Sequence, residues 1–552
     1  MSESGVPVSE NVATPPAASA PAGAPTPGVA RSAGLVGIAT MASRLLGLLR
    51  DWVFLTAFGA GNVMDAYNVA FRLPNLVRDL FAEGAMSAAF VPTFTRELHL
   101  KGKEAAWEPG RIVITGLIVV TGVIAVAGVL LAGPLTSYIA PEYALTPGKL
   151  ELTTTLTQVM FPFLMMIAVA VACMGMLNSL RSFFLPALAP AAFNLACIAS
   201  AFVIVPFMPM FGWHAMVGLA IGTLLGGVAQ LALQWPTLRK EGFTYQLDLD
   251  WRDEGLRRML TLMGPGTIGM AATQVNVFVN TVLATSTVEG AVSWLNYAFR
   301  LMYLPIGLFG VSIATAALPT VSRQTTLQDM SSVRETVSSS LSLMLMLNIP
   351  ATVGLIVLAE PIVRVVLERG RFTPADTAAT AAALQFYAVG LVGYSVVRIV
   401  SPIFFAIGRN RTPVAVSTVV VLINALLNYL LVHTTLSYRG LALGTSIAAL
   451  INAGSLLVLL RGHLQGINEG RLLGSVARIA VASAVMGIAA VWSHNMLGTW
   501  TGTGTFLAEV LRLGLAIGFS LIVLSGSAWL LRIREFNQGV ALVTRRLRRT
   551  SR

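Results

Sequence analysis

Charged residues stand inside strongly apolar stretches of this chain. Residues 41–54 read MASRLLGLLRDWVF and place Arg44, Arg50 and Asp51 in a run that is otherwise almost wholly apolar. If this run crosses a bilayer, each charge at its centre costs about 2.5–3.5 kcal/mol on insertion scales, so the side chains must face protein or water. A guanidinium donates two parallel hydrogen bonds to phosphate. The pattern therefore indicates an internal cavity that binds an anion.

A longer polar stripe runs through residues 64–86. Its members follow one another at steps of three or four residues, which places them on one side of a helix. They are Asp65, Asn68, Arg72, Asn75, Asp79 and Glu83, with Arg78 off this line near its end. Shorter stripes predict further cavity residues in the second half of the chain: Ser293, Asn296, Tyr297, Arg300 and Tyr303, then Tyr387, Tyr394, Arg398 and Ser401.

The charges of these segments do not balance. The arginines are Arg44, Arg50, Arg72, Arg78, Arg300 and Arg398, and the acids are Asp51, Asp65, Asp79 and Glu83. Six arginines against four acids leave an excess of two positive charges, and such an excess favours an anionic substrate. Ion pairs that only hold helices together are the alternative, and this interpretation stays open for Arg72 with Asp65 or Asp79.

The composition is that of an integral membrane protein. Hydrophobic residues make up 55% of the 552 residues and charged residues 11%, whereas soluble domains carry about 25% charged residues. Windows of about 20 mainly apolar residues predict fourteen membrane-spanning helices. They are 34–58, 64–86, 112–140, 153–177, 184–207, 213–235, 260–285, 291–318, 338–359, 377–402, 413–433, 440–460, 472–493 and 507–531. Lys and Arg gather in alternate connections and in the tail RRLRRTSR, which predicts cytoplasmic termini and contact with membrane lipids rather than nucleic acid.

An internal repeat divides the chain into two halves. NVAFRL at 68–73 returns 228 residues later as NYAFRL at 296–301, and FVPTFTR at 90–96 matches ALPTVSR at 317–323. A unit of six spans makes the repeats parallel, with a pseudo-two-fold axis along the membrane normal and the substrate path between the halves. We therefore predict an all-α polytopic membrane protein of two six-helix lobes plus two extra C-terminal helices.

The expected domain boundaries follow from this repeat and from the composition of the two ends. The predicted domains are a disordered tail rich in Pro, Ala and Gly at 1–30, an N-lobe at 31–236, a cytoplasmic loop at 237–258, a C-lobe at 259–461, two further helices at 462–531 and a basic cytoplasmic tail at 532–552.

Several segments resemble the lipid II flippases of the MurJ/MviN family. They are ASRLLGLLRD, FGAGNVMDAYNVAFRLPNLVRDLFAEGAMSAAFVPTF, VSWLNYAFRLMYLPIGLFGVSIATAALP and GRFTPADT. The resemblance implies the fold of the multidrug/oligosaccharidyl-lipid/polysaccharide exporter superfamily, with the last two helices shaping a groove for a lipid tail. It implies transport of lipid II, a disaccharide-pentapeptide on undecaprenyl pyrophosphate. The transporter would move lipid II by alternating access from the inner to the outer leaflet of the bacterial cytoplasmic membrane, for peptidoglycan synthesis.

The resemblance also implies roles for individual residues. The residues that would bind the pyrophosphate are Arg44, Arg50, Arg72, Arg78 and Arg300. Their charge partners would be Asp51, Asp65 and Glu83, and the rest of the cavity would include Asn68, Asn296, Tyr297 and Arg398. Phe299 stands where many members have an acid and Tyr303 where some have a second one, which leaves Arg300 less neutralised and favours an anionic ligand.

A sodium site is thought to exist in the C-lobe of some members. The matching positions here are Asn280, Asn424, Asn428 and Thr445. Their oxygens suit a hard cation, but none of them is an acid, and hydrogen bonds between helices are the alternative. We expect no bound cofactor, and coupling to a monovalent cation or to the membrane potential stays open.

Three other functions are conceivable for such a chain. A polyprenyl-phosphate glycosyltransferase would need an acidic motif in an outer loop, and the acids there form none. A cation-coupled drug or solute antiporter of the same superfamily would need cavity acids rather than surplus arginine. A non-transporting scaffold would have no reason to keep charges inside the membrane. The partners that we expect are lipid II, membrane lipids and cell-wall synthesis proteins.

Overall fold

A computed structural model describes residues 27–79, 90–248, 274–307, 311–501 and 505–537. All regular structure in these ranges is helical. The first half contains α1 (Pro27–Phe58), α2 (Asn62–Asp79), α3 (Val91–Lys101), α4 (Lys103–Leu130), α5 (Ala132–Ile139), η2 (Pro141–Leu145), α6 (Lys149–Met160), α7 (Phe163–Ser179), α8 (Phe184–Val203), η3 (Val205–Phe211) and α9 (Met216–Lys240). The second half contains a helix at 274–285, α11 (Ala291–Pro305), α12 (Val311–Thr326), α13 (Met330–Val357), α14 (Ala359–Leu367), α15 (Pro374–Ala406), α16 (Arg411–Val432), α17 (Tyr438–Leu464), α18 (Glu469–Thr501) and α19 (Phe506–Leu530).

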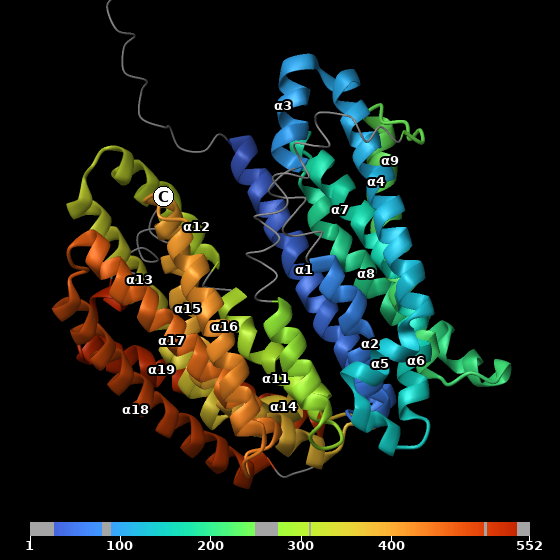
Figure 1. Cartoon of the computed structure of the whole chain (residues 1–552). Helices are drawn as coiled ribbons and strands as arrows, with labels where there is room; N and C mark the ends of the chain where they lie inside the picture. Colours follow the sequence, from blue (N-terminus) through green and yellow to red (C-terminus); the bar gives the residue numbers. More distant parts are fainter. Residues whose placement is uncertain (1–26, 80–89, 249–273, 308–310, 502–504, 538–552) are drawn as a thin grey trace, which may run out of the picture.

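These helices form two lobes. In the N-lobe, α8 packs on α1 and α9, and α7 packs on α4 and α9; in the C-lobe, α15 packs on α11, α13 and α17. The last two helices, α18 and α19, pack on each other and lie outside α13 and α14. The lobes meet at the end where α2, α11 and α14 lie, and they diverge toward the end where α3 and α12 lie (Figure 1). We call these the closed end and the open end.

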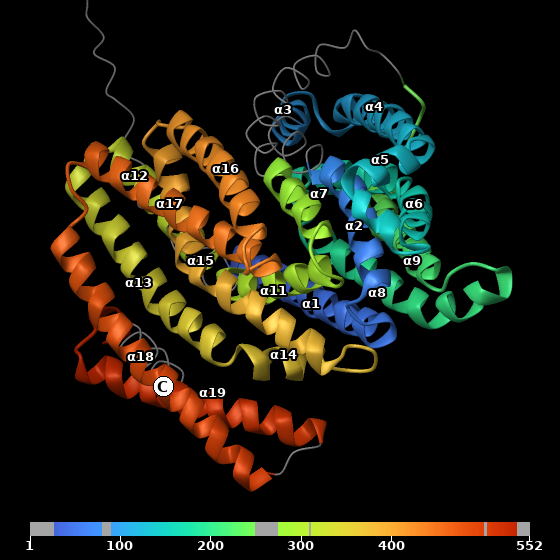
Figure 2. The ribbon, with the colours of Figure 1, turned by 60° about the horizontal axis from the view of Figure 1, so that its bottom comes forward.

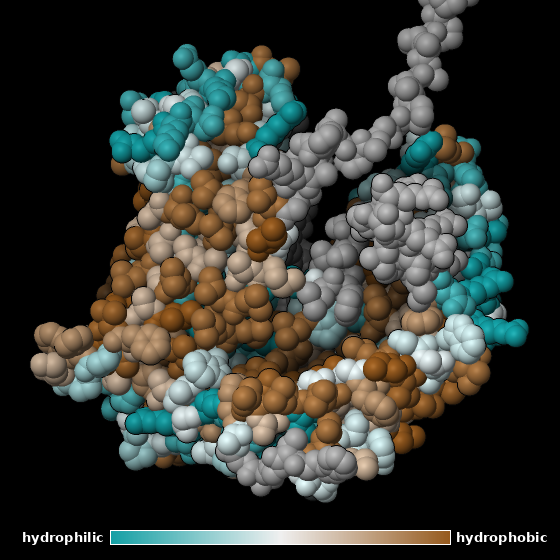
Figure 3. All heavy atoms as spheres, turned by 180° about the vertical axis from the view of Figure 1, so that it is seen from behind, coloured by the Kyte–Doolittle hydropathy of each residue, from teal (hydrophilic) through white to brown (hydrophobic). Residues whose placement is uncertain are grey.

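The surface of the molecule suits a bilayer. Figure 3 shows a broad hydrophobic band over both lobes, hydrophilic residues at the two ends, and a hollow between the lobes. Ten helical segments of the described chain are long and apolar enough to cross a membrane, so this is a multi-pass membrane protein. The other four predicted spans correspond to α1 and α2, which carry charges, and to residues 274–285 and α11, which are short as described. The number fourteen therefore stays a prediction.

Several predicted boundaries differ from the observed helices. The span expected at 153–177 is broken between α6 and α7 at Pro162, which has no N–H for a helical hydrogen bond. The span expected at 112–140 is split into α4 and α5, where Pro134 stands in the first turn of the second helix. Helix α1 begins at Pro27, so the last four residues of the predicted disordered tail are helical. Proline is favoured at a first helical position because its missing N–H has no partner there.

Residues related by the repeat touch each other between the lobes. Ser293 donates hydrogen bonds to Asp65, and Asn296 donates to Asn68 at 3.2 Å, each pair being 228 residues apart in sequence. Equivalent residues can meet only close to the axis that relates the two halves. Helices α2 and α11 therefore lie beside the pseudo-two-fold axis. The exact domain boundaries stay a prediction.

Close packing inside the C-lobe depends on small residues. A Cβ built on Gly393 of α15 would lie 2.6 Å from backbone atoms of Ala449 in α17, whereas a Cβ on Gly454 of α17 would meet no atom within 4 Å. Small residues of this kind let membrane helices approach closely.

We expect Gly393→Val to lower the midpoint of thermal unfolding of the purified protein, because overpacking costs about 1–3 kcal/mol. Gly454→Val, which adds the same side chain on an exposed face, is the matched control and should leave the midpoint unchanged. Equal midpoints for both variants would show that α15 and α17 are not packed as described.

Candidate functional site

A buried carboxylate joins two guanidinium groups from opposite lobes. Asp51 of α1 is 5% exposed, and its Oδ1 accepts from Arg50 Nη2 at 2.8 Å and from Arg50 Nε at 3.2 Å. Its Oδ2 accepts from Arg300 Nη1 of α11. One carboxylate is therefore shared by two guanidinium groups, and the three side chains together carry a net charge of +1.

These arginines open on a cavity of about 520 Å³. It is lined by three arginines, four amides and apolar side chains, and no Asp or Glu is among its described lining residues. The polar lining residues are Arg50, Asn75, Arg78, Asn194, Gln230, Gln234 and Arg300. We call it the arginine cavity. Its positive charge and its amides suit an anion with several oxygens.

The protein holds these guanidinium groups and leaves part of each one available. Arg50 Nη1 donates to Asn194 Oδ1 at 3.1 Å, and its guanidinium lies over the rings of Phe54 and Phe193. Arg78 donates to Asp79 Oδ1 from Nη2 at 2.6 Å and from Nε at 3.0 Å. Because a guanidinium has five N–H donors, both arginines keep donors for a ligand.

The other predicted arginines lie elsewhere. The guanidinium of Arg44 lies against Gly307 at the end of α11, where it fills the space that a Cβ would need. Arg72 lines a neighbouring cavity with Asp79, and its Nε is buried without a hydrogen-bond partner. Glu83 lies outside the described residues. Of the five predicted arginines, Arg50, Arg78 and Arg300 are brought together around one cavity.

Asp51 pairs with Arg50 and Arg300, but the other ion pairs differ from those expected. Asp65 pairs with Lys149 Nζ at 3.7 Å and Asp79 pairs with Arg78, so the expected pairing of Asp65 with an arginine is wrong. Lys149 also donates to Asn62 at 2.7 Å and lies over the ring of Tyr143. Lys149 was not among the predicted residues, and its one signal in the sequence is that it is the only Lys or Arg between Arg111 and Arg181.

Asp65 also joins the two lobes through hydrogen bonds. Its carboxylate accepts from Gly290 N at 2.8 Å, Ser293 N at 3.0 Å and Ser293 Oγ at 2.7 Å, all at the start of α11. The N-terminus of a helix carries unpaired N–H groups and a partial positive charge, which an aspartate stabilises. A backbone hydrogen bond from Arg371 N to Thr56 O adds a second contact between the lobes at the closed end.

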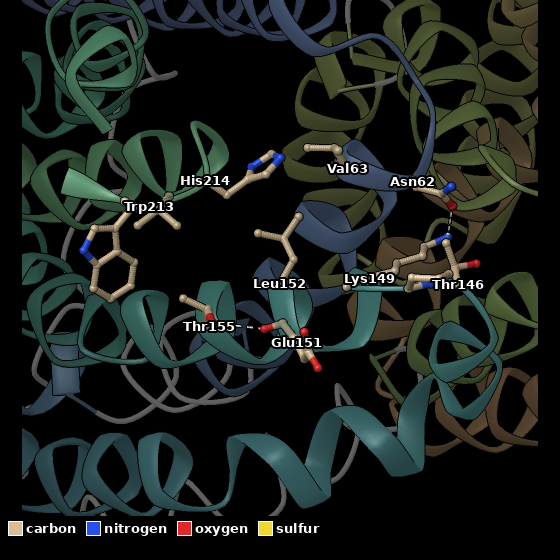
Figure 4. A pocket seen from close by; sticks show the side chains of 13 residues that line it. Asn62, Val63, Thr146, Lys149, Glu151, Leu152, Thr155, Trp213 and His214 are labelled. Atoms are coloured by element: carbon tan, nitrogen blue, oxygen red, sulfur yellow. Dashed lines mark hydrogen bonds between the residues drawn. The ribbon is translucent and has the colours of Figure 1, made fainter. Parts of the chain in front are cut away.

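A separate pocket of about 470 Å³ lies beside this contact, on the N-lobe (Figure 4). Lys149 and Asn62 stand at one side of it and are joined by their hydrogen bond, while Trp213 and His214 stand at the other side. It contains none of the predicted arginines, so we do not assign the substrate to it.

The residues matched to a cation site form a cluster of amides. Asn428 Nδ2 donates to Asn280 Oδ1 at 2.5 Å and to Thr445 Oγ1 at 3.5 Å. Asn424 Nδ2 donates to Asn276 Oδ1 at 2.9 Å, and Asn276 is a member of the cluster that was not predicted. Amide N–H groups already occupy the oxygens of Asn276, Asn280 and Thr445, whereas Asn424 Oδ1 and Asn428 Oδ1 have no partner. All of these side chains are uncharged, so a cation here would have no compensating charge and the cluster fits a cation poorly.

The other predicted cavity residues are spread over the C-lobe side of the contact. Tyr297 is buried, with its hydroxyl 3.6 Å from Met64 Sδ, and its ring lies under Arg300. Arg398 is exposed and donates to the hydroxyl of Tyr303 at 2.7 Å.

Comparison with known proteins identifies the family. The family model described as "Lipid II flippase MurJ" matches residues 54–511. A "Probable lipid II flippase MurJ" of Vibrio cholerae is 33% identical over 508 residues, which cover 89% of this chain and 95% of that protein. The counterpart of Rhizobium meliloti is 34% identical over 520 residues, 91% of this chain and 94% of that protein.

Solved structures agree with this assignment. The structure titled "Lipid II flippase MurJ, inward closed conformation" has a TM-score of 0.72 and 28% identity, covering 90% of this chain and 99% of that one. An inward-facing multidrug resistance MATE family transporter of the MOP superfamily has a TM-score of 0.64 at 16% identity, covering 77% of this chain and 96% of its own, and shows a shared fold. The resemblance seen in the sequence is thereby confirmed, and the chain belongs to the MurJ family of lipid II flippases.

Proposed function

We propose that this chain transports lipid II from the inner to the outer leaflet of the bacterial cytoplasmic membrane, and that the arginine cavity binds its pyrophosphate. The observation that carries the proposal is the convergence of Arg50, Arg78 and Arg300 on one cavity without a lining acid. A pyrophosphate offers several charged oxygens to such a set, and guanidinium groups match their geometry.

The charge distribution supports an orientation with the open end in the cytoplasm. The basic residues at the end of the N-lobe where α3 lies are Arg96, Lys101, Lys103, Arg239 and Lys240. Lys and Arg are enriched on the cytoplasmic side of membrane proteins. Figure 1 shows the start of α1 at this same end, so the N-terminus would be cytoplasmic.

Binding and motion are linked through the charges between the lobes. A pyrophosphate that enters from the open end competes with Asp51 for Arg50 and Arg300. To release it on the other side, the contact between Asp65 and the start of α11 must break. A ligand shifts such an equilibrium only through different contacts in its two states, and this exchange of partners supplies the difference.

The membrane potential is the driving force that we favour over a sodium gradient. The amide cluster carries no charge, whereas the anionic headgroup moves toward the positive outer side. The free energy of transport becomes more favourable by about 2.3 kcal/mol for each negative charge that crosses the membrane at a potential of 100 mV.

We expect Arg50→Ala and Arg300→Ala to weaken binding of undecaprenyl pyrophosphate about 10-fold to 100-fold, since hydrogen bonds to charged groups contribute about 1.5–3 kcal/mol. Native mass spectrometry of the purified protein with undecaprenyl pyrophosphate and with a neutral lipid measures the effect. Arg411→Ala, which removes an exposed arginine at the start of α16, is the matched control. Unchanged binding in the first two variants would exclude the arginine cavity as the anion site.

A cross-link at the closed end should stop transport. Asn68 Nδ2 lies 3.0 Å from Ser293 Oγ across the lobes, so the double variant Asn68→Cys/Ser293→Cys brings two thiols close together. We expect oxidation to abolish flipping of lipid II in proteoliposomes and a reductant to restore it, while each single variant is insensitive to oxidant. The two native cysteines are buried. Full transport by the oxidised double variant would mean that the closed end does not open.

Transport should not require sodium. With a fixed membrane potential, we expect equal flipping rates in proteoliposomes prepared in sodium or in potassium salts, because the amide cluster has no charge to compensate a bound cation. Collapse of the potential should slow flipping in both salts. A rate that rises with sodium concentration at fixed potential would contradict the proposed driving force.

A further inference from the structure

Two adjoining spaces form a large cavity in the C-lobe. One of about 350 Å³ lies between α2 and the C-lobe, and another of about 640 Å³ extends deeper toward α16 and α17. They share the lining residues Asn276, Val277, Phe299, Tyr394 and Thr445. We call the two together the C-lobe cavity. It is distinct from the arginine cavity, with which it shares none of its lining residues.

Aromatic rings form one wall of the C-lobe cavity. Phe299 is stacked with Tyr303 at a centroid distance of 5.8 Å and an interplanar angle of 25°. Tyr387 and Tyr394 meet the ring of Phe299 edge-on at 5.4 and 6.1 Å. The face of an aromatic ring is electron-rich, so it attracts the C–H groups on the face of a pyranose ring.

Three residues that line the C-lobe cavity have an amide oxygen without a hydrogen-bond partner. Asn424 Oδ1, Asn452 Oδ1 and Gln274 Oε1 are buried without a hydrogen-bond partner, and all three residues line the C-lobe cavity. Buried acceptors without a donor are unfavourable, so a ligand with O–H or N–H groups gains hydrogen bonds when these amide side chains turn toward it.

The charges of the C-lobe cavity disfavour a cation. Arg398 is the charged residue among the described lining of its deeper part, and Arg72 lies in its shallower part together with Asp79, which is paired with Arg78. A bound cation would meet two guanidinium groups and one already neutralised carboxylate. The charges therefore exclude a cation, and the aromatic wall and the unpartnered amide oxygens are the features that favour a neutral ligand with hydroxyl and amide donors.

We propose that the C-lobe cavity binds the N-acetylated disaccharide of the substrate, while the arginine cavity binds the pyrophosphate; this rests on the proposed function. An N-acetylated sugar supplies hydroxyl and amide donors, a face of C–H groups and no charge. Phe299 and Arg300 are consecutive residues of α11 that line the two different cavities. They thus present a sugar-binding surface and a phosphate-binding group side by side, as the sugar–phosphate bond of the substrate requires.

Two variants of the full chain test this proposal. Tyr394→Leu removes an aromatic ring from the wall, and Asn452→Leu replaces an amide whose oxygen has no partner by an apolar group of similar size. Tyr429→Leu, at a tyrosine of α16 that is 57% exposed, is the matched control. The measurement is the ratio of affinities for lipid II and for undecaprenyl pyrophosphate, which lacks the sugars and the peptide, by native mass spectrometry.

We expect the unaltered protein to bind lipid II at least about 10-fold more tightly than undecaprenyl pyrophosphate, a difference of about 1.4 kcal/mol. Tyr394→Leu and Asn452→Leu should lose most of this preference and keep the affinity for undecaprenyl pyrophosphate, which also shows that they are folded. A preference that survives in both variants would overturn the proposal.

The control lipids separate this proposal from the one on which it rests. Equal affinity of the unaltered protein for both lipids would overturn the sugar site and leave the arginine cavity standing. Loss of binding to both lipids relative to a neutral lipid would instead reject the proposed function. If sodium chloride but not potassium chloride raised the unfolding midpoint, and Asn424→Leu removed that effect, the C-lobe cavity would be a cation site and the sugar assignment would be wrong.

Discussion

The carboxylate of Asp51 holds the two lobes together by charge. It is buried between Arg50 of the N-lobe and Arg300 of the C-lobe, and each guanidinium uses a different oxygen. Inside a membrane protein neither cation can lose this partner without another in its place. A pyrophosphate provides such a replacement, with more oxygens than one carboxylate has. Occupation of the arginine cavity and contact between the lobes therefore depend on the same two guanidinium groups.

The repeat explains why this contact lies where it does. Asp65 meets Ser293, and Asn68 meets Asn296, because equivalent positions of two parallel halves converge at the axis that relates them. The pairs are not chemically identical, however. The first half contributes the aspartate and the second half contributes a serine at a helix N-terminus. The duplication thus explains the geometry of the contact. Divergence of one partner made it a contact between an aspartate and a helix N-terminus, which can break and form again.

The helical period of the sequence predicted which faces are polar but not which cavity each residue enters. The stripe of α2 was correct in this sense, yet Asn75 and Arg78 line the arginine cavity while Asn68 and Arg72 line the C-lobe cavity. A helix that lies between two lobes faces both of them, and spacing along one helix cannot show this. Lys149 was missed for a related reason, since its partner Asp65 lies 84 residues away in sequence and only the folded chain brings them together.

The resemblance to the family implies an acid at position 299 in many members, and the aromatic ring of Phe299 in this chain has a physical explanation. Arg300 already has a counter-charge in Asp51, so a second carboxylate one residue away would be a buried anion in need of a partner of its own. It would also neutralise the positive charge that the arginine cavity uses to attract a ligand. An aromatic ring avoids both effects, because it adds no charge, packs on Tyr303, Tyr387 and Tyr394, and gives the C-lobe cavity an apolar wall. Helix α11 therefore presents the guanidinium of Arg300 to one cavity and the aromatic ring of Phe299 to the other.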